Sequence, residues 1–323
     1  MRDIIFSMPE QMLTAIQLIP HIAIKKKNFD KILVCGMGGS GISGEILKVL
    51  YPAVHIISNK DYTIPQYLDP NTLAIVISYS GNTEETLSNY ALLRKKGTGM
   101  AIISSGGRLF NKEADIKVKI PGGLPPRGAL GYLFTPLPFM LWKFHIIRAN
   151  PKTGMTNLAN FLKKNRKTIE QKAKNLAKKF IEKLPIIYAN SQTYMPVASR
   201  WQCQLNENAK TLAHINIIPE MNHNEIVGLG RPEALNAGIL SVFLNDPRAH
   251  KRNKTRVAIM HRIIKGLFSR AVEIKPQGNN DLKRMFWTIM LGDFISYYLA
   301  RATNIDPLPV KRIDYLKREL SKI

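Results

Sequence analysis

Cysteine is scarce in this sequence of 323 residues, which has only Cys35 and Cys203. Neither has a partner at a spacing typical of metal or redox sites, so we expect no metal site and no disulfide framework. No apolar run is long enough to span a bilayer, and residues 1–10 lack the hydrophobic core of a signal peptide. We therefore expect a soluble, cytoplasmic protein without a membrane partner, with both cysteines packed in the core.

Acidic residues are also scarce: 23 Asp and Glu stand against 47 Lys and Arg, a formal net charge of +24. Such an excess has three possible explanations: nucleic-acid binding, an electrostatic field that steers an anionic metabolite, or a basic bias of the whole proteome that is unrelated to function. The excess is dense at residues 152–183, but no aromatic residues interleave it as they do in proteins that bind single strands. This segment carries apolar residues at helical spacing and predicts a long amphipathic helix with a basic, solvated face. We expect no nucleic-acid partner.

Apolar runs typical of buried strands alternate with helical patterns along most of the chain. Short links between strands and helices favour a parallel sheet covered on both faces, and the pattern starts again after residue 184. The sequence therefore predicts an α/β protein with two similar halves in tandem. The expected strands are residues 31–35, 54–57, 73–77, 100–103 and 116–120 in the first half, and 185–189, 215–218, 238–244 and 272–274 in the second.

We expect three segments: an N-terminal domain at residues 1–150, a basic linker helix at 151–184 and a C-terminal domain at 185–323. The first ends in a mostly apolar helix at about residues 130–147, and a helix at 195–210 follows the first strand of the last.

A glycine-rich loop at residues 36–41, GMGGSG, lies directly between an expected strand and an expected helix. This is the context of a dinucleotide-binding fingerprint, which is completed by an acidic residue about twenty positions further on. Asp61 is loosely available, but it lies past the expected end of the next strand. A Walker loop is excluded because no Gly-Lys-Ser/Thr occurs in the sequence.

A second corner, SYSGNTEET at residues 78–86, also joins an expected strand to an expected helix. Helix starts present backbone N–H groups and a positive dipole end, which suits a phosphate monoester, although Ser, Thr and Asn cap helices everywhere. Both corners follow strands of one parallel sheet, so they can converge on one small anion, and this favours a sugar phosphate over NAD. The expected phosphate site comprises Gly38, Gly39, Ser40, Ser78, Ser80 and Thr83.

Residues 35–40 and 78–86 resemble the sugar isomerase (SIS) domain. Further on, QLNENAK at 204–210 and PEMNHNEI at 219–226 resemble the bifunctional phosphoglucose/phosphomannose isomerase family, in the same order along the chain. The resemblance implies two tandem SIS-type subdomains, each a parallel sheet flanked by helices. It also implies an aldose–ketose isomerase without cofactor or metal, which interconverts glucose 6-phosphate, mannose 6-phosphate or both with fructose 6-phosphate.

The resemblance assigns roles to four residues that would otherwise pass for ordinary surface or structural side chains. Glu207 matches the base that moves a proton between C1 and C2 through a cis-enediol, and Arg127 matches the arginine that faces the enediolate. His223 matches the ring-opening histidine. In such dimers this histidine comes from the neighbouring subunit, which implies a homodimer. Lys317 matches a C-terminal lysine that reaches the sugar.

The sequence departs from the family's pattern at two places. Members with mannose activity tend to carry a threonine shortly before the C-terminal lysine, where this chain has Val310, so the glucose activity is the firmer expectation. The second half reads Ala189-Asn190-Ser191 where relatives often show Gly-Ser, which fits an idle second phosphate loop. Two alternatives stay open: a non-catalytic SIS-type sensor of sugar phosphates, and an NAD-dependent enzyme that uses the glycine loop.

Overall fold

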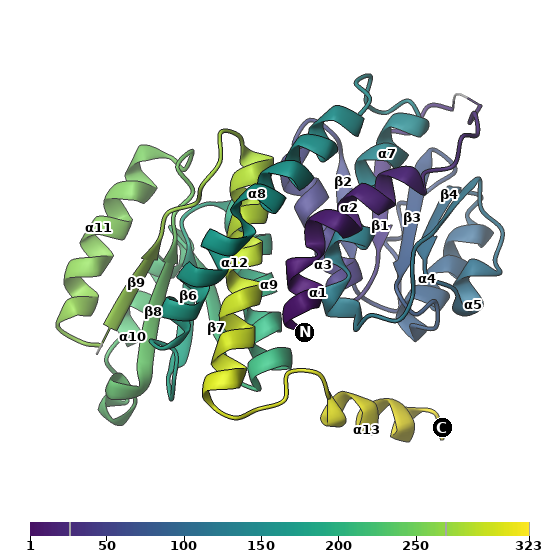
Figure 1. Cartoon of the computed structure of the whole chain (residues 1–323). Coiled ribbons are helices and arrows are strands. Elements are labelled where there is room, and N and C mark those ends of the chain that lie inside the picture. Colours follow the sequence, from purple (N-terminus) through teal and green to yellow (C-terminus); the bar gives the residue numbers. More distant parts are fainter. Residues whose placement is uncertain (26, 269, 323) are drawn as a thin grey trace. The chain divides into compact units, whose positions relative to one another are not determined.

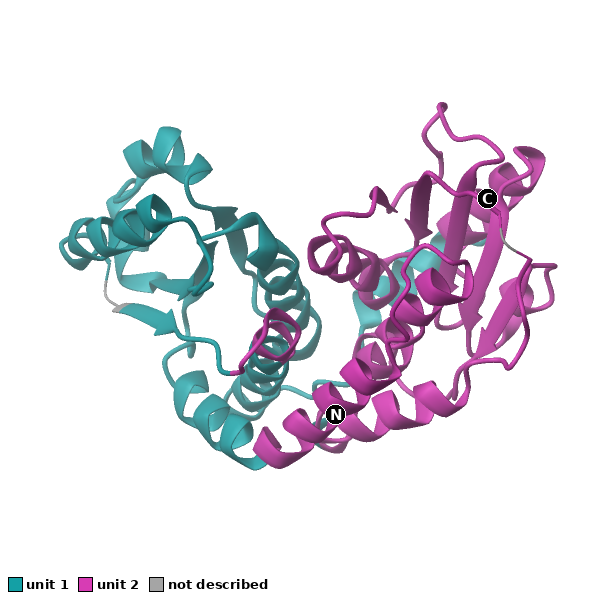
Figure 2. Cartoon of the chain, turned by 90° about the horizontal axis from the view of Figure 1, so that it is seen from above, with its two compact units in different colours: residues 1–2, 167–277, 287–323 teal, residues 3–166, 278–286 magenta. Residues whose placement is uncertain are grey.

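The computed structural model describes residues 1–25, 27–268 and 270–322 of the chain (Figure 1). The chain divides into two compact units, which Figure 2 shows in different colours. The N-terminal unit comprises residues 3–166 and 278–286, and the C-terminal unit comprises residues 1–2, 167–277 and 287–323. One boundary falls inside the helix α8 (Lys152–Ala177).

The N-terminal unit contains a parallel sheet of five strands in the order β2-β1-β3-β4-β5. All seven residues of the central strand β3 are buried, as is typical of a strand covered on both faces of a parallel sheet. Next to it, Cys35 at the end of β1 lies opposite Val76. The strands are β1 (Lys31–Cys35), β2 (Ile56–Asn59), β3 (Thr72–Ser78), β4 (Gly99–Ser104) and β5 (Ile116–Lys119).

Helices before, between and after these strands flank the sheet (Figure 1). The single helix expected at residues 130–147 was wrong: the structure has α6 and then α7, which ends at Lys143. The break falls at Thr135 because Pro136 has no N–H to continue the helical hydrogen bonding. The helices are α1 (Arg2–Phe6), α2 (Met8–Gln17), α3 (Gly38–Leu50), α4 (Glu84–Lys95), α5 (Gly107–Phe110), α6 (Leu130–Phe134) and α7 (Pro136–Lys143).

The C-terminal unit contains a parallel sheet of four strands in the order β7-β6-β8-β9. The two helix-flanked parallel sheets confirm the expected fold class. Cys203, on α9, is exposed, so its expected core position was wrong, whereas Cys35 is buried. The elements are β6 (Leu184–Ala189), α9 (Met195–Gln204), β7 (His214–Ile217), α10 (Glu225–Gly228), β8 (Ile239–Leu244), α11 (Lys251–Lys265), β9 (Arg270–Ile274), α13 (Lys311–Leu320) and, from residue 287 on, α12 (Asp281–Ala302).

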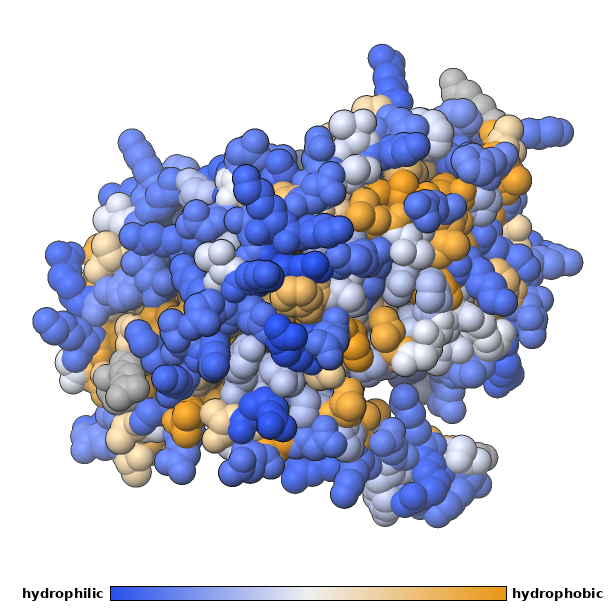
Figure 3. Space-filling view, in the orientation of Figure 1, coloured by the Kyte–Doolittle hydropathy of each residue, from blue (hydrophilic) through white to orange (hydrophobic). Residues whose placement is uncertain are grey.

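Hydrophilic residues cover most of the face shown in Figure 3, and hydrophobic surface gathers near α2. There Leu13, Ile16 and Phe139 help to line a groove of about 620 Å³ on the N-terminal unit. The helix α8 buries an apolar stripe that includes Leu162 and Ile169 and leaves its lysines toward solvent, which confirms its amphipathic character. Among the described residues, no helix is long and apolar enough to cross a membrane.

Candidate active site

The first corner joins β1 to α3 at the carboxyl edge of the N-terminal sheet. Gly38 opens the helix with φ +50°, a left-handed conformation that favours glycine. Ser40, two residues further on, is 4% exposed. A Cβ atom on Gly36 would stand 3.0 Å from the carbonyl oxygen of Ile77, so the backbone of this corner lies directly against the end of β3.

The second corner joins β3 to α4 and is held together by its own hydroxyl groups. The Oγ of Ser78 lies 2.9 Å from the Oγ1 of Thr83 and accepts a hydrogen bond from the N–H of Gly81 at 3.0 Å. The Oγ of Ser80 accepts from the N–H of Asn82 at 3.2 Å. Ser78 is buried, whereas Ser80 is exposed. Because β1 and β3 are parallel neighbours, both corners open on the same edge of the sheet.

A third segment brings Arg127 to the first corner. This residue lies in the short 3₁₀ turn η1 (Pro126–Gly128) and is 5% exposed. A Cβ atom on Gly39 would stand 2.9 Å from the carbonyl oxygen of Pro126 and 3.5 Å from the Cα of Arg127. Only a glycine at position 39 allows this close approach. Gly39 and Arg127 are 88 positions apart in the sequence, and the fold places them side by side.

Two residues outside the expected site hold the segment with Arg127 in place. The buried hydroxyl of Tyr79 donates to the carbonyl oxygen of Pro121 at 2.9 Å and accepts from the N–H of Leu124 at 3.0 Å. Burial raises the pKa of Tyr79, so it stays a donor at neutral pH. From α2, the amide of Gln11 donates to the carbonyl oxygen of Gly128 at 3.0 Å. Tyr79 stands among the hydroxyls of the second corner, which is the signal that could have revealed it.

Glu207 lies in the C-terminal unit, in the π-helical turn η3 (Leu205–Ala209) that follows α9. It is half-buried, and its neighbour Asn208 donates to the Oγ of Ser296 on α12 at 3.0 Å. Single π-helical turns are frequent at functional sites because they re-aim a side chain without ending the helix. The sequence predicted an unbroken helix here, and only the structure shows the turn.

A buried ion pair fixes the helix that leads to Glu207. Arg200 on α9 and Asp293 on α12 are 3% and 1% exposed, and the Nη2 of the arginine lies 2.7 Å from the Oδ2 of the aspartate. Removing one partner of such a pair typically costs about 3–5 kcal/mol, because it leaves an uncompensated buried charge. Nearby, the indole of Trp201 donates to the carbonyl oxygen of Thr288 at 2.9 Å. The base of the turn with Glu207 is therefore rigidly anchored.

His223 is exposed at the end of the 3₁₀ turn η4 (Glu220–His223). Two residues later, the carboxylate of Glu225 ties this turn to the sheet. It accepts from the buried hydroxyl of Tyr188 on β6 at 2.7 Å and from the amide of Asn216 on β7, and the Nε2 of His214 lies 3.2 Å away. Burial and this carboxylate raise the pKa of Tyr188.

The expected site residues thus fall into two groups. Gly38, Gly39, Ser40, Ser78, Ser80, Thr83 and Arg127 gather at one edge of the N-terminal sheet. Glu207, His223 and Lys317 belong to the C-terminal unit, on η3, η4 and the exposed face of α13. In the part of the chain that the structure describes, no cluster of three or more His, Cys, Asp and Glu side chains could hold a metal ion.

Comparisons with known proteins agree with this architecture. The SIS domain model matches residues 24–126, and the model of the bacterial phospho-glucose isomerase C-terminal SIS domain matches residues 169–320. A bifunctional phosphoglucose/phosphomannose isomerase of Caldicellulosiruptor bescii is 40% identical, over 100% of this chain and 99% of the relative. One of Aquifex aeolicus is 36% identical, over 90% of each chain. The chain belongs to the bifunctional phosphoglucose/phosphomannose isomerase family.

Solved structures show how widely the fold of this isomerase family is shared. The C-terminal domain of glucosamine-fructose-6-phosphate aminotransferase from Francisella tularensis superposes with a TM-score of 0.70 at 16% identity, covering 94% of this chain and 96% of that one. Tagatose-6-phosphate ketose/aldose isomerase from Escherichia coli gives 0.69 at 14% identity, covering 94% of each. At such low identity these likenesses show the double-SIS fold alone.

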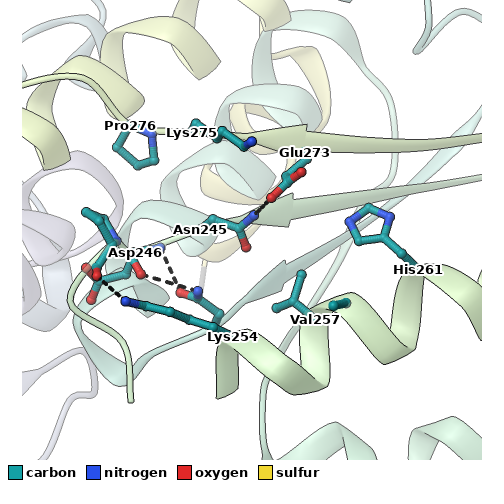
Figure 4. Close-up of a pocket in the computed structure, with 11 residues that line it drawn as sticks. Asn245, Asp246, Lys254, Val257, His261, Glu273, Lys275 and Pro276 are labelled. Carbon is teal, nitrogen blue, oxygen red and sulfur yellow. Dashed lines mark hydrogen bonds between the residues drawn. The ribbon is translucent and has the colours of Figure 1, made fainter. Parts of the chain in front are cut away.

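At its carboxyl edge, the second sheet of this family member carries a buried carboxylate instead of the hydroxyl groups found in the first. Asp246, 4% exposed, lies two residues beyond β8 (Figure 4). Its carboxylate accepts from the Oγ of Ser191 at 2.7 Å and from the N–H of Arg248 at 2.8 Å, and its own N–H donates to Asn190. A buried carboxylate between the ends of β6 and β8 repels a phosphate. This geometry gives a physical reason for the idle second loop expected from Asn190 and Ser191.

Proposed function

We propose that this isomerase interconverts glucose 6-phosphate and mannose 6-phosphate with fructose 6-phosphate through a cis-enediol. The observation that carries the proposal is the meeting of two hydroxyl-rich corners with Arg127, from a distant third segment, at one edge of the N-terminal sheet. The relatives named phosphoglucose/phosphomannose isomerase support the choice of substrates. The activity toward glucose 6-phosphate is the firmer part, because Val310 stands where a threonine would favour mannose.

In this proposal the N-terminal corners hold the phosphate. The hydroxyls of Ser40, Ser78, Ser80 and Thr83 donate to its oxygens, together with backbone N–H groups at Gly38 and Gly39. The starts of α3 and α4 add the positive ends of two helix dipoles. The phosphate does not react. Its binding fixes the distance of C1 and C2 from the corner.

Glu207 acts as the base in the proton transfer. Its carboxylate removes the proton from C2 of the open-chain aldose, and the electrons form the C1–C2 double bond of the enediolate. The same proton is then delivered to C1 while the hydroxyl proton of O2 passes to O1, which gives the ketose. Arg127 faces the negative oxygen of the enediolate and stabilises it. The half-buried position of Glu207 and the buried position of Arg127 suit groups that act out of bulk water.

His223 opens the sugar ring by moving a proton from the O1 hydroxyl to O5 as the C1–O5 bond breaks. Glu225 supports this role, because its hydrogen bonds to Tyr188 and Asn216 hold the turn that carries His223 on the sheet. The imidazole is exposed at the end of this turn, so it can serve a neighbouring chain. We therefore propose a homodimer in which each active site takes His223 from the partner, and in which Lys317 contacts the sugar.

The test of the mechanism is Glu207→Gln, which keeps the shape of the side chain and removes its basicity. Turnover of fructose 6-phosphate in a coupled assay with EDTA should fall about 10⁴-fold, because general base catalysis contributes factors of about 10²–10⁴. The exposed Glu182→Gln in the same unit is the matched control and should keep wild-type turnover. Unchanged turnover of Glu207→Gln would refute the proposed base, and a chain inactive toward both sugar phosphates would refute the proposed substrates.

Mixing two inactive variants tests the shared site. A mixed dimer of Glu207→Gln and His223→Ala chains has one doubly altered site and one intact site if His223 crosses between subunits. After exchange of an equal mixture, activity should return to about one quarter of the wild-type value, because half of the dimers are mixed. If both residues act within one chain, the mixture stays inactive.

A further inference from the structure

The hydroxyl of Tyr79 joins the second corner to the segment that carries Arg127. Tyr79 follows Ser78 directly in that corner and is 5% exposed. Its hydroxyl donates to the carbonyl oxygen of Pro121 at 2.9 Å and accepts from the N–H of Leu124 at 3.0 Å. One buried side chain of the corner therefore holds two points of a segment that lies 42 and 45 positions further along the chain.

The backbone of Tyr79 is itself fixed to the end of the neighbouring strand. Its carbonyl oxygen accepts from the N–H of Ser105 at 3.0 Å and from the Oγ of the same serine at 2.6 Å. Ser105 directly follows β4, which pairs with β3 along the sheet. The side chain of Tyr79 thus extends from a rigid sheet edge, and a rigid element can hold a functional group of a loop in one position.

The two hydrogen bonds of the hydroxyl lie on either side of a pair of exposed glycines, Gly122 and Gly123. Gly123 has φ +88°, a left-handed conformation that glycine adopts without strain. A Cβ atom on Gly123 would meet no atom of the described residues within 4 Å, and one on Gly122 would meet only Ser105, at 3.7 Å. Packing does not hold this pair, so the segment can turn there when the hydroxyl of Tyr79 is removed.

The connection from Leu124 to Arg127 is stiff. Pro125 and Pro126 lie between them, and a proline ring fixes φ near about −65°. Pro125 has φ −61° and ψ 134°, and its carbonyl oxygen accepts from the N–H of Gly128 at 2.8 Å, across the turn η1. A displacement of Leu124 therefore moves Arg127 with it.

We propose that Tyr79 is a positioning residue for Arg127 in the isomerase reaction. Its hydroxyl closes the glycine pair and keeps the guanidinium where the enediolate forms. The phosphate of the substrate binds at the corner that contains Tyr79, so one side chain sets the distance between the bound phosphate and the guanidinium. The role of Arg127 rests on the proposed function, whereas the hold of Tyr79 on the segment does not depend on it.

The first experiment measures the hold on the segment in Tyr79→Phe, which removes the hydroxyl and keeps the ring. Tyr90→Phe is the matched control, because Tyr90 is also buried and its hydroxyl donates to the carbonyl oxygen of Glu113 at 2.8 Å, ahead of β5. Amide hydrogen exchange of the full chain should become about tenfold or more faster over residues 121–128 in Tyr79→Phe, and should stay unchanged there in Tyr90→Phe. Thermal unfolding verifies that both variants are folded.

The second experiment measures the consequence for catalysis by steady-state kinetics with glucose 6-phosphate. The kcat of Tyr79→Phe should fall about tenfold or more with KM within about twofold, because a misplaced Arg127 stabilises the enediolate less and leaves substrate binding unchanged. In an Arg127→Lys background the same substitution should cost about twofold or less, since Tyr79 acts through the guanidinium. Tyr90→Phe should keep the wild-type kinetics.

Equal exchange over residues 121–128 in Tyr79→Phe and the wild type would overturn the proposal, as would faster exchange with an unchanged kcat. An equal loss of kcat in the Arg127→Lys background would overturn it too, because Tyr79 would then act independently of Arg127. Failure of the proposed function has a different signature: the wild type would turn over neither sugar phosphate, and the exchange experiment alone would decide whether Tyr79 holds the segment.

Discussion

The two sheets of this chain carry different functional groups at the same topological position: a hydroxyl in the N-terminal sheet and a carboxylate in the C-terminal sheet. In the N-terminal sheet the last paired residues of the two central strands are Cys35 and Val76, and Ser78 lies two positions beyond Val76. In the C-terminal sheet the corresponding pair is Ala189 and Leu244, and Asp246 lies two positions beyond Leu244. These positions line the crevice at the carboxyl edge of each sheet. A hydroxyl there allows a phosphate to bind in the crevice, whereas a buried carboxylate repels it.

This difference fits the division of tasks between the two units that the proposed function requires. The N-terminal edge keeps small, neutral groups that can donate to an anion: Ser40, Ser78 and the glycines that let Arg127 approach. At the C-terminal edge, Asp246 forms hydrogen bonds with Ser191 and Asn190. Glu207 and His223 lie in the same unit, on the turns η3 and η4. In the proposed function, the same fold binds phosphate in the unit whose sheet edge is uncharged and supplies catalytic side chains from the unit whose sheet edge holds a buried carboxylate.

The largest effect is expected from Ser78→Asp, which places a carboxylate at the edge of the first sheet, as Asp246 does in the second. The carboxylate would face the substrate phosphate, and like charges at such distances cost several kcal/mol. We expect kcat/KM for glucose 6-phosphate to fall about a thousandfold or more. Steady-state kinetics measures this, and thermal unfolding verifies the fold.

Two companion variants make that result interpretable. Ser78→Ala removes one hydrogen bond without adding charge and should cost only about tenfold in kcat/KM. Ser88→Asp places the same charge further along α4, away from the crevice, and should cost little. Equal kinetics for Ser78→Asp and Ser78→Ala would show that the crevice does not bind phosphate.

A smaller effect is expected from Arg127→Lys, which keeps the positive charge and loses the planar guanidinium. The kcat should fall about a hundredfold with little change in KM, because the proposed contact forms with the enediolate and not with the bound sugar. Arg94→Lys, an exposed substitution on α4, is the control. A rise in KM with unchanged kcat would place Arg127 on the substrate rather than on the enediolate.

The smallest effect on catalysis is expected from Asp246→Ser, which replaces the carboxylate in the second sheet by a hydroxyl like that of Ser78 in the first. Activity should stay within about twofold of wild type, because the proposed function places no part of the substrate at this edge of the second sheet. Stability should fall by about 1–3 kcal/mol, since Ser191 and the N–H of Arg248 lose a charged acceptor. Urea unfolding measures the loss against the exposed control Asp306→Ser. A large loss of activity in a folded variant would contradict the division of tasks between the two sheets.

The fold was largely predictable because its strands are buried on both faces. Continuous apolar runs such as those of β3 and β8 have no competing interpretation once short links and helical patterns separate them. The local backbone conformation was harder to predict. The break before Pro136 and the π-helical turn at Glu207 depend on individual hydrogen bonds, which periodicity does not report.

The parallel α/β pattern, the two hydroxyl-rich corners and the family motifs around Glu207 and His223 could be predicted from the sequence, because each of these lies in a short stretch of neighbouring residues. Only the tertiary structure placed Arg127 against Gly39, tied Glu225 to Tyr188 and put Asp246 where Ser78 stands in the other sheet. These relations join residues from 37 to 88 positions apart or compare two separate sheets. Packing creates such neighbours, and no local pattern encodes them.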